Sequence, residues 1–206
     1  MSALESLTNS FVAAFNVFLN PNANYKQVQN AELSTSAILL AIAGFIAGIF
    51  QALSTIFLMS SFAIPGLISS MAAFTLIILA PIGALIGWLI WTIVIFILIY
   101  IAGARPGFSH LASWLAYPLA ASTIISGVLS LIPFVGSILS SLVTLYMLYV
   151  IYILLQKLEK ATSGQALLPV IIIGIFVVLT IIANILLQSI LISAKAFTSG
   201  MQPKLM

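Results

Sequence analysis

The chain of 206 residues is 63% hydrophobic and only 4% charged, with a formal net charge of +3. Because about 25% of the residues in an ordinary soluble domain are charged, this composition excludes a soluble globular protein and indicates a membrane protein. The chain has no cysteine and one histidine, which excludes disulfides, thiolate metal sites and cysteine nucleophiles.

Residues 3–19 form the first predicted element, an amphipathic helix. Its apolar side chains recur at three- and four-residue spacing: Leu4, Leu7, Phe11, Phe15 and Phe18. Such a helix lies either in the plane of the lipid headgroups or against the protein's own spans, and the pattern leaves both arrangements open. The stretch NPNANYKQ, residues 20–27, then ends the helix. We therefore predict that residues 1–33 form a cytoplasmic helix and linker.

The apolar runs that follow predict an all-α polytopic bundle of about five transmembrane helices over residues 34–195. The runs cover about 36–59, 66–102, 108–131, 134–156 and 167–193. As one helix, the second run would measure roughly 55 Å, against a hydrocarbon core of about 30 Å. It is either one long helix kinked at Pro81 or a separate segment over residues 66–80 followed by a span.

The positions of the basic residues favour five spans. With five, Lys26, Arg105, Lys157 and Lys160 share one face of the membrane, and Lys195 and Lys204 lie on the other. Basic residues accumulate on the cytoplasmic side. We therefore predict a multi-pass protein of the cell membrane with its N-terminus in the cytoplasm and residues 196–206 as a short extracytoplasmic tail.

Small residues spaced four apart occur in two of the spans. Gly44 and Gly48 form one pair, and Gly83 and Gly87 form another. Such pairs let helix backbones approach closely in lipid. They either pack the bundle internally or form a contact with a second copy or another membrane subunit.

Uncharged polar residues gather in the predicted outer halves of the spans. The candidates for an intramembrane polar cluster are Gln51, Thr55, Thr180, Asn184 and Gln188. They serve either as hydrogen bonds between helices or as the lining of a hydrated vestibule. We expect Asn184 and Gln51, at similar depth, to bond across the bundle.

No charged residue lies deep in any span. The acids are Glu5, Glu32 and Glu159, and the chain has no aspartate. Proton relays, ion-coupled transport, hydrolysis and metal binding all need clusters of ionisable side chains. We therefore expect no catalytic residue, no metal site, no cofactor and no nucleic-acid partner.

The stretch GARPGFSHL, residues 103–111, marks the boundary between the second and third spans. Pro106 ends the second span, Ser109 is the expected cap of the third, and the lone His110 begins that span at the interface. If this end of the protein has a function, we expect a cytoplasmic contact made by Arg105 with Lys157 and Lys160.

Several short motifs occur in a fixed order along the chain. They are FLNPNANY after the first helix, GARPGFSHL, LAYPLA inside the third span, LIPFVGS in the next turn, and LEKATSGQAL before the last span. This order resembles the Yip family, five-span proteins named in eukaryotes for interacting with Ypt/Rab GTPases, and especially its prokaryotic members. Ala104, Pro106, Gly107 and Gln165 depart from the family pattern. The resemblance implies a non-enzymatic role in membrane organisation, but it does not carry over GTPase binding, because the eukaryotic Asp-Leu-Tyr-Gly-Pro element does not occur here.

Three functions are compatible with the sequence. The first is a Yip-like integral membrane scaffold or accessory subunit, with other membrane proteins or further copies of itself as partners. The second is a passive carrier for a small neutral solute, although an odd span count and the lack of an internal repeat argue against it. The third is lipid binding or curvature sensing by residues 3–19.

Overall fold

The computed structural model describes residues 3–61, 66–132 and 135–200, and every regular element in these ranges is helical. In chain order the elements are α1 (Ala3–Leu19), α2 (Pro21–Asn24), the 3₁₀ helix η1 (Tyr25–Val28), α3 (Leu33–Ser61), α4 (Gly66–Ile101), α5 (Phe108–Leu129), α6 (Val135–Leu158) and α7 (Ser163–Gly200). Five of the described helices, α3 to α7, are long and apolar enough to cross a membrane. The predicted all-α polytopic bundle is confirmed.

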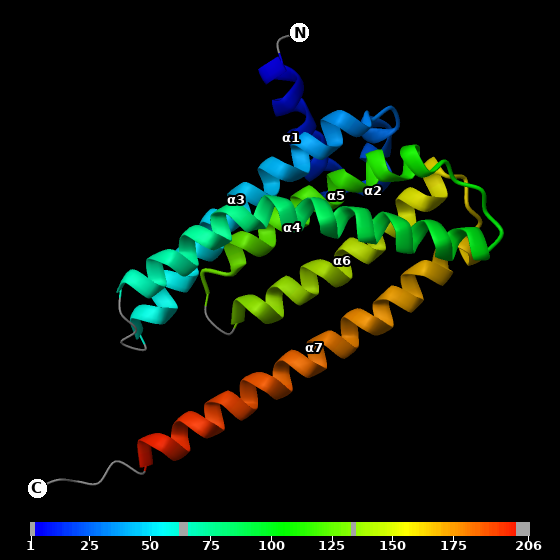
Figure 1. The fold of residues 1–206 in the computed structure, drawn as a ribbon. Helices are drawn as coiled ribbons and strands as arrows, with labels where there is room; N and C mark the ends of the chain where they lie inside the picture. Colours follow the sequence, from blue (N-terminus) through cyan, green and yellow to red (C-terminus); the bar gives the residue numbers. More distant parts are fainter. Residues whose placement is uncertain (1–2, 62–65, 133–134, 201–206) are drawn as a thin grey trace, which may run out of the picture.

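Helix α5 lies at the centre of the bundle. It packs against α1, α3, α4 and α6, whereas α7 packs along α6 and α4 and runs away from the other helices towards its C-terminal end (Figure 1). The buried share of the most apolar window is 67% in α5 and 17% in α7. The core is therefore organised around α5, and α7 is a peripheral helix.

Helix α4 continues without interruption from Gly66 to Ile101, with Pro81 inside it. This result decides between the two arrangements that the sequence left open, because residues 66–80 are the first part of one long helix. Pro81 lies against α3, where a Cβ atom added to Gly44 would meet the Pro81 Cα at 2.8 Å. The proline therefore sits in a helix interior that a neighbouring helix supports.

Side-chain hydrogen bonds tie α5 to α3 and to α4. The Ser36 hydroxyl of α3 donates to the Ser113 carbonyl at 2.8 Å, and the Trp88 indole of α4 donates to the Ala112 carbonyl at 2.8 Å. Bonds of this kind contribute about 0.6 to 2 kcal/mol each between helices in lipid. They fix α5 against the α3–α4 hairpin near the end of the bundle where α5 begins.

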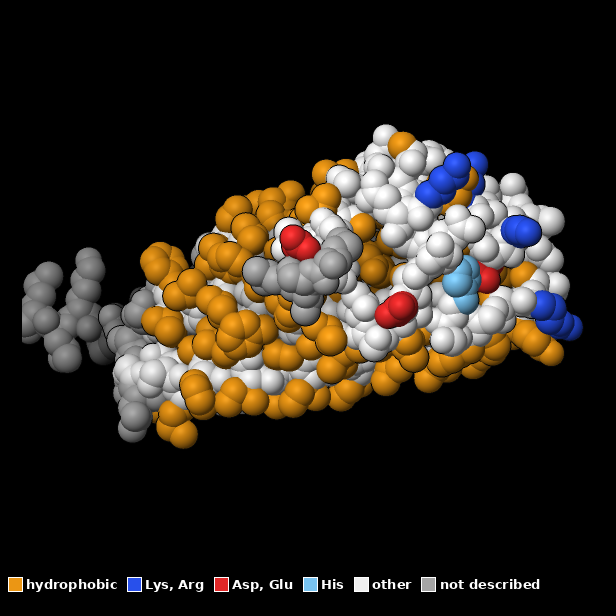
Figure 2. Space-filling view, turned by 90° about the horizontal axis from the view of Figure 1, so that it is seen from above, with side chains coloured by type: hydrophobic (Ala, Val, Ile, Leu, Met, Phe, Trp, Pro, Cys, Tyr) orange, Lys and Arg blue, Asp and Glu red, His pale blue; other side chains and the backbone are white. Residues whose placement is uncertain are grey.

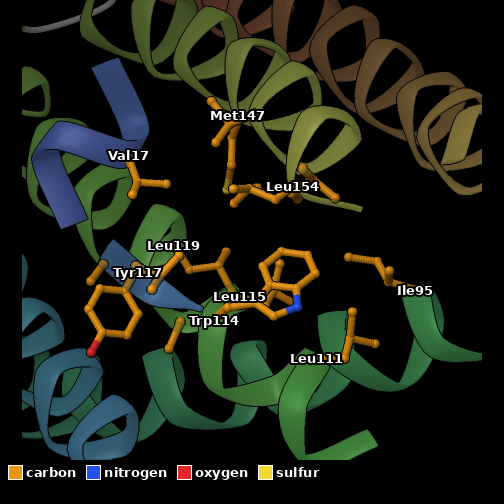
Figure 3. Packing of buried hydrophobic residues seen from close by; sticks show 14 of the residues in the cluster. Val17, Ile95, Leu111, Trp114, Leu115, Tyr117, Leu119, Met147 and Leu154 are labelled. Atoms are coloured by element: carbon orange, nitrogen blue, oxygen red, sulfur yellow. The ribbon is translucent and has the colours of Figure 1, made fainter. Parts of the chain in front are cut away.

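The hydrophobic core surrounds Trp114, which is completely buried. Figure 3 shows its indole between Ile95 of α4 and Leu154 of α6, with Val17 of α1 on the same side of α5 as Met147. The helices α3 and α7 also contribute buried residues, so one cluster connects α1 with all five long helices. Close packing has to stabilise this cluster, because lipid is as apolar as the side chains and burial from it gives little hydrophobic drive.

The N-terminal helix α1 packs against the bundle through the second half of its apolar face. Ala14, Val17 and Phe18 are buried, and Phe11 and Phe15 are partly buried against the same core. Of the two arrangements open at the sequence level, the structure therefore favours packing on the protein's own spans.

Asparagines end α1 as expected and also redirect the chain. The Asn20 side chain accepts from the Ala23 amide, with Pro21 in the first turn of α2. The Asn24 amide donates to the carbonyls of Asn16 and Asn20, both at 3.1 Å. The Asn16 carbonyl also accepts the Asn20 backbone amide at 2.9 Å, so the Asn24 side chain adds a second bond there and ties the turn to the end of α1.

Candidate functional site at the basic end of the bundle

One end of the bundle carries the basic residues. The linker before α3, the connection from α4 to α5 and the turn from α6 to α7 all lie there, and they bring together Lys26, Arg105, Lys157 and Lys160. We call this the basic end. Figure 2 shows Lys and Arg side chains gathered near the single histidine, while hydrophobic side chains cover much of the rest of that face. Such a distribution matches a helix bundle that projects its charged end from the bilayer.

The connection from α4 to α5 begins with a Schellman motif. Gly103 has φ +89°, the Ala104 amide donates to the Ile99 carbonyl at 3.1 Å, and the Gly103 amide donates to the Tyr100 carbonyl at 3.0 Å. A glycine is suited to this left-handed position because it has no Cβ. The motif ends α4 at Ile101, four residues before Arg105.

Arg105 is exposed but folds back over the end of α4. Its guanidinium lies 3.9 Å from the centre of the Tyr100 ring, and Nη1 donates to the Tyr100 carbonyl at 3.4 Å. A cation at a helix C-terminus interacts favourably with the helix dipole. Arg105 therefore has a structural role at the end of α4 in addition to its exposure at the surface.

The turn from α6 to α7 has a strained residue and a capping box. Lys160 has φ +52°, in the left-handed region that residues other than glycine rarely adopt. The Thr162 amide donates to Gln165 Oε1 at 3.0 Å, and the Gln165 amide donates back to Thr162 Oγ1 at 3.4 Å. This reciprocal pair starts α7. It also accounts for Gln165, one of the departures from the family pattern.

A polar cluster at the basic end connects three segments of the chain. Glu159 Oε1 lies 2.8 Å from His110 Nδ1 and accepts a hydrogen bond of 2.8 Å from the Trp114 indole N–H. The other imidazole nitrogen, His110 Nε2, lies 3.0 Å from the Gln29 carbonyl. The Glu159 side chain is only 6% exposed, against 38% for His110. The carboxylate is thus held inside the end of the bundle, and the imidazole bridges it to the linker before α3.

This cluster was not predicted from the sequence. The interpretation of His110 as a boundary residue is compatible with its place in the first turn of α5, but the structure gives the ring two partners. Glu159 is 49 residues away and Gln29 is 81 residues away. The available signal was that the single histidine and Glu159 both border spans at the same predicted membrane face. The expected cap is wrong, because Gly107 and not Ser109 occupies the N-cap position of α5.

The predicted contact residues all lie at the basic end, and all are exposed. Arg105 stacks on Tyr100, the Lys157 ammonium lies 6.0 Å from the centre of the Tyr25 ring, and Lys160 occupies the left-handed turn position. Each therefore has a different local environment.

The two glycine pairs have different surroundings. A Cβ at Gly44 would lie 2.8 Å from the Ala84 Cβ, and one at Gly48 would lie 2.8 Å from the Ala80 Cβ. A Cβ at Gly83 or Gly87 would meet nothing within 4 Å. The first pair packs α3 on α4, whereas the second lies on an open face of α4.

The predicted intramembrane polar residues are distributed over two separate helices. Thr55 donates to the Gln51 carbonyl at 2.8 Å on α3, and Thr180 donates to the Phe176 carbonyl at 2.8 Å on α7. The side chains of Asn184 and Gln188, and with them the expected bond from Asn184 to Gln51, lie outside the described residues. The structure therefore gives only local hydrogen bonds for the described hydroxyls of this set.

A groove of about 240 Å³ lies between α4, α6 and α7, and Trp91, Ser141, Thr144 and Thr180 contribute to its lining. The three hydroxyls donate to carbonyls four residues earlier in their own helices, at 2.8 to 3.0 Å. Their hydrogens are therefore already engaged, so these hydroxyls offer a solute acceptor lone pairs but no free donor. Among the residues that the structure describes, no group of three or more His, Cys, Asp or Glu side chains could hold a metal ion.

These features define a multi-pass α-helical membrane protein with a polar, basic end. Residues 15–185 match the family model of the Yip1 domain. The match covers most of the chain, which therefore belongs to the Yip1 domain family, as its resemblance to the Yip family predicted. No curated protein and no solved structure matches it.

Proposed function

We propose that the protein is a non-enzymatic integral membrane scaffold or accessory subunit that binds another membrane protein through its basic end. The observation that carries this proposal is the exposure of Arg105, Lys157 and Lys160 at one end of a Yip1-family helix bundle. A partner with acidic residues in its membrane-proximal segments would complement these cations. Electrostatic complementarity of this kind favours association and selects partners.

The proposal includes an orientation and a membrane. The distribution of basic residues supports a multi-pass protein of the cell membrane with the basic end in the cytoplasm. With five spans, the N-terminus is then cytoplasmic and the C-terminus is outside. The domain organisation follows as residues 1–33 in the cytoplasm, 34–195 as the membrane domain and 196–206 as the tail.

The open face of α4 supplies a second place for a subunit contact. Gly83 and Gly87 leave room for close approach of another helix, either from a second copy or from a partner. This contact is independent of charge, so the two surfaces are separable by mutation.

The experiment is copurification of the tagged chain from native membranes in a mild detergent, followed by identification of the proteins recovered with it. Its variant carries Arg105→Glu, Lys157→Glu and Lys160→Glu together, and we expect this charge reversal to abolish recovery of the partner. A second variant, Gly83→Leu with Gly87→Leu, leaves the basic end unchanged and tests the open face of α4 separately. Monomer with no partner from the unmodified chain would contradict the proposal.

Charge reversal could also invert the protein in the membrane. A cysteine introduced at Asn30, in a chain that has no other cysteine, reports orientation by its reaction with a membrane-impermeant thiol reagent. Loss of the partner with unchanged orientation supports a contact at the basic end. Retention of the partner by a correctly oriented triple variant would contradict it.

A further inference from the structure

The bridge formed by His110 needs a proton on both nitrogens of the imidazole ring. Both imidazole nitrogens face oxygen acceptors, Nδ1 at 2.8 Å from the Glu159 carboxylate and Nε2 at 3.0 Å from the Gln29 carbonyl. A backbone carbonyl can only accept, and the Trp114 indole N–H already donates to the same carboxylate oxygen. Only the doubly protonated imidazolium can donate to both acceptors at once.

A neutral ring must give up one of these two bonds. Its single proton can lie on Nδ1 and bond to the carboxylate, or on Nε2 and bond to the carbonyl. Hydrogen bonds to an ionised acceptor are roughly twice as strong as those between neutral groups. The proton therefore remains on Nδ1, and the lone pair of Nε2 faces the Gln29 carbonyl oxygen. The bond to the linker is the one that is lost.

We propose that His110 is a proton-dependent latch that holds the linker before α3 to the start of α5. The latch is closed when the imidazole carries two protons and opens at the Gln29 carbonyl when it loses one. The contact therefore weakens as the pH rises and the imidazole loses its second proton. Glu159 remains bound to Trp114 and His110 in both states.

The other charged groups around the latch are exposed. The linker side contributes Lys26 and Glu32, the α6–α7 turn contributes Lys157 and Lys160, and the connection from α4 contributes Arg105. The helix α1, which also packs against α5, has Glu5 in its first turn, at the end of α1 away from the linker. The closest ionic partner that the structure gives His110 is Glu159.

Opening of the latch changes a short segment only. Val28 is completely buried, and Pro21 is buried at the start of α2, so both hold the N-terminal segment in place when the bond to Gln29 is lost. Gln29 and Asn30 are exposed. The expected response is increased local mobility at residues 29–32, without undocking of α1.

The test places a nitroxide spin label on Asn30→Cys in the otherwise cysteine-free full chain, reconstituted in lipid vesicles. Electron paramagnetic resonance spectra are recorded from about pH 5 to pH 8. We expect the ratio of mobile to immobile label to rise about fivefold with pH, as loss of one hydrogen bond implies. A label on Leu131→Cys, at the opposite end of the bundle, should keep its spectrum throughout.

Two variants distinguish the latch from a general effect of pH. Glu159→Gln can turn its amide N–H towards His110 Nδ1, at the expense of the Trp114 bond to the same position. A neutral ring can then accept at Nδ1 and still donate from Nε2 to Gln29, so the label should stay immobile at high pH. His110→Arg keeps its hydrogen-bond donors at every pH, so the label in this variant should also remain immobile. An unmodified chain without a pH response would overturn the proposal. So would a response that persists in both folded variants.

Discussion

At the scale of single residues, Glu159 organises the basic end because it accepts bonds from two parts of α5. The Trp114 indole and the His110 ring both reach the same carboxylate oxygen. The sequence indicated that no charged residue lies deep in a span and located the cations at one end. It did not indicate that Glu159 and His110 would contact each other. A carboxylate in a polar turn gives no local sign of burial, since its burial depends on how α5 and α6 pack.

The indole bond to Glu159 should be measurable in stability. We expect Trp114→Phe to lower the free energy of unfolding by about 1 to 3 kcal/mol from the lost charged hydrogen bond, with a further loss from reduced packing. Trp91→Phe is the matched control, because Trp91 is only partly buried beside the groove. Thermal unfolding in detergent measures both. Equal destabilisation by the two substitutions would argue against a special contribution from the bond to Glu159.

At the scale of elements, helix existence was predictable and helix contacts were not. Apolar runs located all five candidate spans, because long apolar segments need internally bonded helices in lipid. The choice for residues 66–80 depended on α3, which packs along α4 and supports Pro81. The capping box of Thr162 and Gln165 was not predicted from the sequence. The different surroundings of the two glycine pairs depend on how α3 packs against α4.

The glycine pairs give a matched test of the α3–α4 contact. Gly44→Ala inserts a methyl group 2.8 Å from the Ala84 Cβ, so we expect it to cost about 1 to 3 kcal/mol through overpacking. Gly87→Ala enters open space and should change stability by less than about 1 kcal/mol, with a small gain from helix propensity. Thermal unfolding in detergent compares the stability of the two variants. A neutral Gly44→Ala would mean that α3 and α4 separate at little cost.

The capping box makes a prediction about the start of α7. Thr162→Ala removes the oxygen that accepts the Gln165 amide, and we expect a loss of about 0.5 to 2 kcal/mol. Hydrogen exchange should accelerate in the first turn of α7 and stay unchanged in α5. The neighbouring Ser163→Ala is the control, and acceleration of similar size in that variant would remove the capping box as the explanation.

At the scale of the whole molecule, successive helices alternate in direction and place their connections at opposite ends of the bundle. The linker before α3 and the turn after α6 lie at the basic end, and the turn after α5 lies at the other. In vesicles, single cysteines at Asn30 and Thr162 should therefore react with an impermeant reagent from the same side, and one at Leu131 from the opposite side. Reaction of all three from one side would contradict alternate crossings by α3 to α6.

The central position of α5 has a consequence for biosynthesis. Its most apolar window has a mean hydropathy of 1.4, against 2.7 in α4 and 3.0 in α7. On leaving the ribosome, α5 is thus the span least able to partition into lipid alone, while α3 and α4 are already made. We expect nascent α5 to remain in the membrane by docking on that hairpin. A substitution that disrupts the α3–α4 hairpin would then first reduce the insertion of α5 into the membrane.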